Sequence, residues 1–442
     1  MFAESRPGRL VRAPENFLDA EAIRAVQSGR RDFLRSALAG AAAVGAGTAG
    51  AQSADGEKVI LEPQPHATSL GKPVAASPYG MPSKYESNLA RRESPGLTRV
   101  SAASVSFSPL QGMFGIITAS GLHFERHHQG FVEIDPAEHR LMVMGMVRAP
   151  KVYTMEALMR LPSVSRMHFI ECGANTGMEW GNVAVPTVQY THGMLSCSEF
   201  TGVRLKDVLA HCGADIRRGR FVLAEGGDGS GMTRTIPMEL VESGEVMLAW
   251  GMNGEMLRPE NGYPLRLVVP GVQGVSWVKW LRRIEVGDQP FGAKDEVLHY
   301  TDLMPDGTHR QYTSIQEAKS VITSPSGGQR LTATGYYTIT GLAWSGRGKV
   351  ARVDVSVDGG RNWKTATLQT PILSKCLTRF TLPWVWNGGE ALLASRVTDS
   401  TGYVQPTMRQ LRAVRGTRSI YHNNAIQNWQ VAKSGEVSNV QL

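Results

Sequence analysis

The segment with the most distinctive chemistry is a strand-like run that ends in a cysteine. Residues 166–171 alternate as a strand does, and the pattern changes at Cys172 to small and turn-forming residues, among them Gly173 and Asn175. A thiol at the tip of a strand can bind a soft metal, attack a substrate or pack inward. Because free cysteine is among the most buried residue types, core packing is as good an interpretation of Cys172 as chemistry.

The other cysteines carry weaker signals. Cys212 lies at helical spacing from Leu205 and Val208, which predicts a core side chain. Cys376 falls in a loop-like Ser-Lys-Cys stretch and is expected to have no special role. Cys197 stands among small residues, and we expect either core packing or a minor role in a site.

Two isolated cations and a glycine-rich loop are candidates for binding an anion. Arg266 and Lys279 lie in otherwise apolar stretches, where a charge needs an anionic partner or access to solvent. Residues 226–231 follow a strand-like run and combine glycines with Asp228. Such a loop can hold a phosphate with its backbone amides, although glycine clusters are more often simple turns.

The composition favours a globular protein with a sizeable core. The chain has 442 residues, of which 42% are hydrophobic and 19% charged, and its formal net charge is +8. The charges are interspersed without a Lys/Arg stripe, which suits anionic substrates or an acidic protein partner and argues against nucleic acid. The four cysteines form no Cys-x-x-Cys-His or paired Cys-x-x-Cys motif, so we expect neither haem in this chain nor a disulfide scaffold.

The first 51 residues have the pattern of an export signal. Residues 29–35 read Gly-Arg-Arg-Asp-Phe-Leu-Arg, and an Ala/Gly-rich stretch follows that ends in a small-residue cleavage site before Gln52. The alternative is a chance arginine pair before an alanine-rich helix. We predict a twin-arginine signal peptide over residues 1–51, a periplasmic mature protein, and no membrane anchor because the apolar run is too short. This route exports folded proteins, which favours a cofactor inserted before export.

The rest of the chain divides into an arm and two domains. Residues 52–99 are rich in Pro, Ser and Gly and predict an extended arm, either a solvated linker or a strap over a partner subunit. Residues 100–317 mix strands and short helices without a repeating βαβ pattern, which predicts an α+β domain. Residues 318–432 alternate as β-strands do and predict an immunoglobulin-like sandwich. Residues 433–442 are expected to be a C-terminal tail.

Three motifs, in order, resemble the sulfite-oxidase family of molybdenum enzymes. They are Phe-Glu-Arg-His-His at residues 124–128, the Cys172 loop, and Gly-Tyr-Pro-Leu-Arg at residues 262–266 followed by Val-Lys-Trp-Leu at residues 278–281. The resemblance implies a mixed α/β molybdopterin-binding domain followed by an all-β dimerisation domain. Within the family, three segments are similar to the molybdenum subunits of sulfane dehydrogenases, namely residues 122–128, 300–307 and 421–425.

The resemblance also implies a molybdenum–molybdopterin cofactor, with the thiolate of Cys172 as the protein ligand of the metal. A soft thiolate suits a high-valent metal that already carries a dithiolene. For catalysis the resemblance implies Arg126, facing an anion beside the metal, and Tyr300, around which the spacing departs from the family. The implied cofactor-binding residues are Phe124, Glu125, Arg126, His127, His128, Cys172, Asp228, Asn261, Arg266, Trp277, Val278 and Lys279.

The sequence departs from the sulfite oxidases close to the cysteine. Thr176 and Gly177 stand where that family has two arginines, Asn261 where it has a histidine, and Ser276 where it has an arginine. Fewer cations and less bulk disfavour a small dianion such as sulfite and favour a larger, less charged sulfur group. We therefore expect an oxidoreductase that oxidises the sulfane sulfur of a thiosulfate-derived group on a cysteine of a carrier protein.

The partners and the alternatives follow from the same resemblance. Electrons are expected to pass to a c-type cytochrome subunit, and two chains are expected to pair through the C-terminal domain. A sulfite dehydrogenase on the same fold is the first alternative, and a reductase fits less well with the departures after Cys172. The alternative of another class is a non-enzymatic periplasmic binding or assembly protein that uses the sandwich for contacts.

Overall fold

The computed structural model describes most of the chain beyond the predicted signal peptide. The described residues are 69–74, 76–93, 101–181, 184–311, 315–418 and 421–442. The predicted signal peptide over residues 1–51 lies outside them. Pro82–Leu442 form one compact unit, which contains both predicted domains. Within the described residues, no helix has the length and hydropathy needed to cross a membrane.

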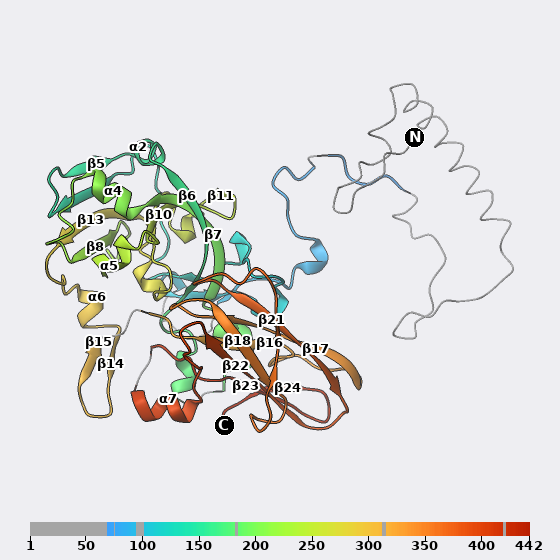
Figure 1. Cartoon of the computed structure of the whole chain (residues 1–442). Helices are drawn as coiled ribbons and strands as arrows, with labels where there is room; N and C mark the ends of the chain where they lie inside the picture. The colour runs from blue at the N-terminus through green and yellow to red at the C-terminus, as the bar shows by residue number, and fades with distance from the viewer. Residues whose placement is uncertain (1–68, 75, 94–100, 182–183, 312–314, 419–420) are drawn as a thin grey trace, which may run out of the picture. The chain divides into compact units, whose positions relative to one another are not determined.

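Two sheets form most of the first domain (Figure 1). In one, the strand order is β11-β10-β7-β6, with β12 paired to β10; in the other it is β5-β4-β13-β8-β9. A small β1-β2-β3 sheet and the β14–β15 hairpin complete the domain. The strands are β1 Arg92–Glu93, β2 Val105–Phe107, β3 Glu125–Arg126, β4 Leu141–Gly145, β5 Lys151–Tyr153, β6 Ser163–Glu171, β7 Leu195–Arg204, β8 Phe221–Gly226, β9 Thr233–Pro237, β10 Met247–Met252, β11 Glu255–Met256, β12 Arg266–Val268, β13 Leu281–Gly287, β14 Thr301–Leu303 and β15 His309–Gln311.

Short helices connect these strands, and their ends carry the signals expected from the sequence. The hydroxyl of Thr154 accepts a hydrogen bond from the amide of Ala157 at the start of α2, and the buried Cys212 is the C-cap residue of α4. Because the domain combines two sheets with short helices, the predicted α+β class is confirmed. The helices of this domain are α2 Met155–Met159, α3 Val188–His192, α4 Leu205–His211, α5 Met238–Glu242 and α6 Lys294–Val297.

The second domain is a sandwich of two antiparallel sheets, as predicted, with the orders β16-β17-β21-β20 and β19-β18-β22-β23-β24. Trp344, Phe380 and Trp429 are fully buried between the sheets. Helix α7, Met408–Arg415, follows the last long strand. The strands are β16 Lys319–Ser324, β17 Gly335–Trp344, β18 Val350–Ser356, β19 Lys364–Thr365, β20 Thr367–Leu368, β21 Thr378–Trp386, β22 Ala391–Asp399, β23 Asn428–Val431 and β24 Val437–Val440.

Strands β6 and β7 contribute to the cores of both domains. Successive side chains of a strand point to opposite faces. Phe169 and Cys197, which are paired across the ladder, pack in the sandwich core, whereas Ile170 and Phe200 pack in the core of the first domain. The end of β6, where Cys172 follows, is therefore held from two sides.

Two predicted boundaries need correction. The expected tail at residues 433–442 contains β24, which pairs with β23 from Val431↔Val437 to Asn428↔Val440 and so belongs to the sandwich. The expected arm at residues 52–99 ends too late, because the compact unit begins at Pro82 and Arg92–Glu93 already pair with β2. Both short strands are specified by the partner strand and not by a long apolar pattern of their own.

Candidate active site

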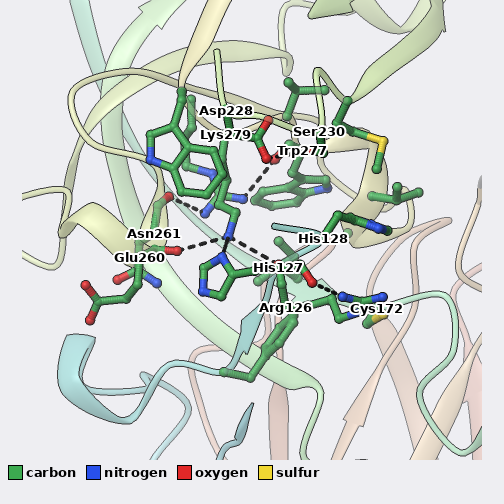
Figure 2. Close-up of a pocket in the computed structure, with 18 of the residues that line it drawn as sticks. Arg126, His127, His128, Cys172, Asp228, Ser230, Glu260, Asn261, Trp277 and Lys279 are labelled. Carbon is green, nitrogen blue, oxygen red and sulfur yellow. Dashed lines mark hydrogen bonds between the residues drawn. The ribbon is translucent and has the colours of Figure 1, made fainter. Parts of the chain in front are cut away.

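Cys172 follows the last residue of β6 and lines a cavity of the first domain (Figure 2). The residue is 9% exposed, and its amide donates a hydrogen bond to the carbonyl of Met194 at 3.0 Å. Burial raises the pKa of Cys172, whereas a hydrogen bond from the backbone of Ala174 and the charge of Arg126 lower it. A stable thiolate here therefore requires a further positive partner, such as a metal ion.

The cavity brings together residues that are far apart in the sequence. They come from β3 and its flanks, the end of β6, the loop after β8, the segment between β11 and β13, and the residue before β14. Every predicted site residue except Glu125 is among them, Tyr300 included. The lining residues are His123, Phe124, Arg126, His127, His128, Ile170, Cys172, Asp228, Ser230, Met232, Glu260, Asn261, Arg266, Gly274, Val275, Trp277, Val278, Lys279, Trp280 and Tyr300.

Arg266, on β12, is a buried cation that has no carboxylate partner among the residues that the structure describes. It is 2% exposed, and its guanidinium donates to the carbonyls of Asn261 at 2.9 Å and Trp277 at 3.1 Å. The guanidinium carbon lies 5.8 Å from the ring centroids of both Phe200 and Trp277. Within the described residues it forms no ion pair. Burial lowers the pKa of Arg266 to about 9, so the charged form lacks a compensating anion.

Lys279 is a second buried cation in the same cavity. Its ammonium donates to the carbonyls of Arg126 at 3.2 Å and Glu260 at 3.1 Å and to Nδ1 of His127 at 2.9 Å. Figure 2 shows it at the centre of the labelled residues, where these bonds converge. Burial, aided by the nearby charge of Arg266, lowers the pKa of Lys279 to about 7. An anion in the cavity would reverse this effect by favouring the charged form.

Glu125 supports the site from outside its lining. Its carboxylate accepts a hydrogen bond from Nε2 of His127 at 2.9 Å and forms an ion pair with Arg91. Because Nε2 donates to the carboxylate, Nδ1 is left to accept from Lys279. The predicted direct contact of Glu125 with the cofactor is therefore not supported. Glu125 instead orients the ring of His127.

Several buried polar atoms of the cavity have no hydrogen-bond partner in the described part of the chain, and they indicate what kind of group the cavity fits. They are Nε of Arg266, Oδ1 of Asn261 and Nε2 of His123. Burial lowers the pKa of His123 to about 3, so its ring is neutral. Each such atom costs about 1–3 kcal/mol when it is left unpaired. Two buried cations that form no ion pair within the described residues, together with these polar atoms, fit a polar, anionic group such as the phosphate and heterocycle of a pterin cofactor.

The end of the cavity near Cys172 carries Arg126 and Tyr300. Figure 2 shows Arg126 next to Cys172, away from Asn261 and Glu260. Of the described cations that line the cavity, Arg126 is the one whose charge acts on the pKa of Cys172. Tyr300 is 8% exposed and has a positive φ of 53°, a sparsely populated conformation that is found preferentially at functional sites.

The sequence reasoning missed several lining residues. His123, Ser230, Glu260 and Trp280 each lie within two residues of a predicted one, so closeness to the motifs was the available signal.

The structure also shows where the other cysteines lie. Cys197, for which a minor site role was open, is fully buried in the sandwich core at 3.4 Å from the sulfur of Cys376, outside the cavity lining.

Comparison with known proteins defines the class of this site. Residues 128–294 match the family model described as oxidoreductase molybdopterin binding domain. Residues 310–429 match the model described as Mo-co oxidoreductase dimerisation domain. The fold and site are thus those of a molybdopterin-dependent oxidoreductase.

Similar proteins identify the family. Sulfite oxidase from Gallus gallus is 33% identical over 66% of this chain and 68% of that protein. An NADH nitrate reductase from Hordeum vulgare is 32% identical over 62% of this chain, which corresponds to 33% of that longer protein. The crystal structure of the sulfane dehydrogenase SoxCD from Paracoccus pantotrophus contains a chain that is 48% identical, with a TM-score of 0.85 over 87% of this chain and 98% of that one. The chain belongs to the sulfite-oxidase family of molybdenum enzymes.

The residues present fit the molybdenum–molybdopterin cofactor of this family. Arg266 and Lys279 are placed to bind its phosphate, and Asn261 and His123 offer free polar atoms to its heterocycle. The thiol of Cys172, which lines the same cavity, offers a soft ligand to the metal. When bound, the cofactor supplies two-electron redox chemistry with transfer of an oxygen atom that originates from water.

Proposed function

We propose that this protein is a periplasmic dehydrogenase that oxidises the sulfane sulfur of a thiosulfate-derived group carried on a cysteine of a partner protein. Each oxygen atom added from water releases two electrons and two protons. The observation that carries the proposal is the 48% identity, over 98% of its length, to the chain from a sulfane dehydrogenase, against 33% to sulfite oxidase over a smaller part of this chain.

The loop that follows Cys172 brings no additional positive charge to the cavity, which supports a substrate of low charge. Thr176 and Asn175, which follow Cys172, turn into the protein interior, where the hydroxyl of Thr176 donates to the carbonyl of Asn423 and the amide of Asn175 to Glu171. The loop after Cys172 therefore adds no cation to the described lining of the cavity. A small dianion such as sulfite would be bound more weakly there than a monoanionic sulfur group on a larger carrier.

Each residue near Cys172 has a defined role in this proposal. Arg126 pairs with the anionic sulfur group and holds it beside the metal. Tyr300, whose pKa burial raises, stays protonated and donates a hydrogen bond to the oxygen being added. Its ring stacks on Tyr421, with 4.7 Å between centroids, and lies 5.3 Å from the guanidinium of Arg234, which fixes its orientation.

The electrons leave through a partner subunit, which we propose to be a c-type cytochrome. The sequence has no Cys-x-x-Cys-His motif that would attach a haem to this chain. The twin-arginine pattern at residues 29–35 supports export of the folded, cofactor-loaded protein to the periplasm. The match of residues 310–429 to a dimerisation domain supports pairing of two chains through the sandwich.

Steady-state kinetics with the purified holoenzyme and cytochrome c as acceptor tests the proposal. The substrates to compare are free sulfite and a carrier protein or peptide that bears a cysteine persulfide. We expect a kcat/KM for the persulfide at least 100-fold above that for sulfite. A value that favours sulfite by the same factor would overturn the proposed substrate and leave the enzyme class intact.

A further inference from the structure

A buried ion pair connects the sandwich domain to the residue that precedes Cys172. Glu171 is the last residue of β6 and Lys319 the first of β16, and each is 2% exposed. The Lys319 ammonium donates to Oε1 of Glu171 at 2.8 Å. Charged side chains are rarely buried this far unless they are paired, and breaking such a pair leaves an uncompensated charge in the interior.

The Glu171 carboxylate is the centre of a small hydrogen-bond network. The indole N–H of Trp344, on β17 of the sandwich, donates to Oε2 at 2.8 Å. The side-chain amide of Asn175, in the loop after Cys172, donates to Oε1 at 2.9 Å. The carboxylate therefore ties two residues of the sandwich to the loop.

Lys319 also holds the far end of this loop. Its ammonium donates to the hydroxyl of Thr176 at 2.8 Å, and that hydroxyl donates to the carbonyl of Asn423 at 2.8 Å. Thr176 has a φ of 64°, which a β-branched residue adopts rarely and which its surroundings must therefore impose. One lysine thus bonds to the residue before Cys172 and to a strained residue after it.

We propose that Lys319 is a positioning residue for Cys172: from the sandwich domain it fixes both ends of the Cys172 loop. This inference rests on the proposed role of Cys172 as the metal ligand. It is independent of the substrate.

The test compares Lys319→Met with Lys375→Met. Lys375 also reaches from the sandwich to a carboxylate of the first domain, Glu245, but that pair does not touch the Cys172 loop. The first readout is the alkylation rate of Cys172 by iodoacetamide in molybdenum-free protein, followed by mass spectrometry of its peptide. Cys197, Cys212 and Cys376 are 0–1% exposed and report in the same sample whether the fold is intact.

We expect Lys319→Met to accelerate alkylation of Cys172 by at least tenfold, with the other three cysteines protected as in the native protein. In Lys375→Met, Cys172 should be alkylated at the native rate. In the molybdenum-loaded protein, the electron paramagnetic resonance spectrum of the metal should change in Lys319→Met and stay native in Lys375→Met. A native alkylation rate together with a native spectrum in Lys319→Met would overturn the proposal.

If Lys319→Met exposes all four cysteines, the double variant Glu171→Gln/Lys319→Met decides. It removes both charges and keeps one carbonyl oxygen, which can accept the hydrogen bond of either Trp344 or Asn175, so part of the domain contact survives without the buried charge. We expect Cys172 alone to be alkylated faster than in the native protein, and a native rate would refute the inference. Because neither readout involves turnover, failure here is distinct from failure of the proposed substrate.

Discussion

Replacing Arg266 by methionine should separate cofactor binding from folding. Burial lowers the pKa of Arg266 from 12.5 to about 9, which corresponds to roughly 5 kcal/mol of destabilisation of the charged form at about 1.36 kcal/mol per pKa unit. Its two hydrogen bonds to backbone carbonyls stabilise the charged form by about 1.5–3 kcal/mol each. In the cofactor-free protein these effects nearly cancel. We therefore expect Arg266→Met to change the free energy of unfolding there by less than about 2 kcal/mol.

The loaded protein should behave differently, because the guanidinium then has an anionic partner. Loss of one partner of a buried charge pair costs about 3–5 kcal/mol, which lowers affinity by at least about 100-fold. Arg234→Met is the control, since Arg234 has a partner within the chain, Glu296 at 3.8 Å. That variant should lose stability with or without cofactor.

Denaturant unfolding of both forms, together with molybdenum and pterin analysis, measures these effects. The expected result for Arg266→Met is a stable, cofactor-poor protein. A variant that unfolds several kcal/mol more easily without cofactor, and yet retains a full molybdenum content, would refute the assignment of Arg266 to the cofactor phosphate.

Three further predictions concern the same cavity. Cys172→Ser should yield a folded protein with little activity, and substantial turnover by a metal-loaded variant would contradict its role as ligand. Arg126→Met should lower kcat/KM for an anionic sulfur substrate by roughly 10- to 100-fold through loss of a charge-assisted hydrogen bond, and an unchanged value at equal molybdenum content would exclude that contact. Burial lowers the pKa of Lys279 from 10.5 to about 7, so the unfolded chain binds its proton more tightly than the folded one. The free energy of unfolding of cofactor-free protein should thus rise between about pH 7 and 10.5, relative to Lys279→Met in the same denaturant titration, and parallel pH profiles would contradict the shift.

The order of the motifs in the sequence, more than the residue types, pointed to the residues that the structure brings together in one cavity. Taken by itself, Cys172 could not be distinguished from a core cysteine, and Cys197, Cys212 and Cys376 are indeed core residues. The order of the motifs separated it from them. Arg266 was recognised as a cation in an apolar strand, but its lack of a carboxylate partner in the described structure depends on what packs around it.

The sequence could not predict contacts between distant segments. Lys319 lies in a buried strand and needs a partner, yet its partner Glu171 lies 148 residues away and is brought to it by the packing of two domains. Strand β24 was missed because Val437 and Val440 offer little apolar pattern and the strand forms by pairing with β23. Local patterns specify elements, whereas these contacts depend on tertiary structure.

The central claim is a bond between the sulfur of Cys172 and molybdenum. X-ray absorption at the molybdenum edge of the holoenzyme measures the number of sulfur neighbours of the metal. We predict that this number falls by one between the native protein and a molybdenum-loaded Cys172→Ser variant. An unchanged number of sulfur neighbours would contradict the claim.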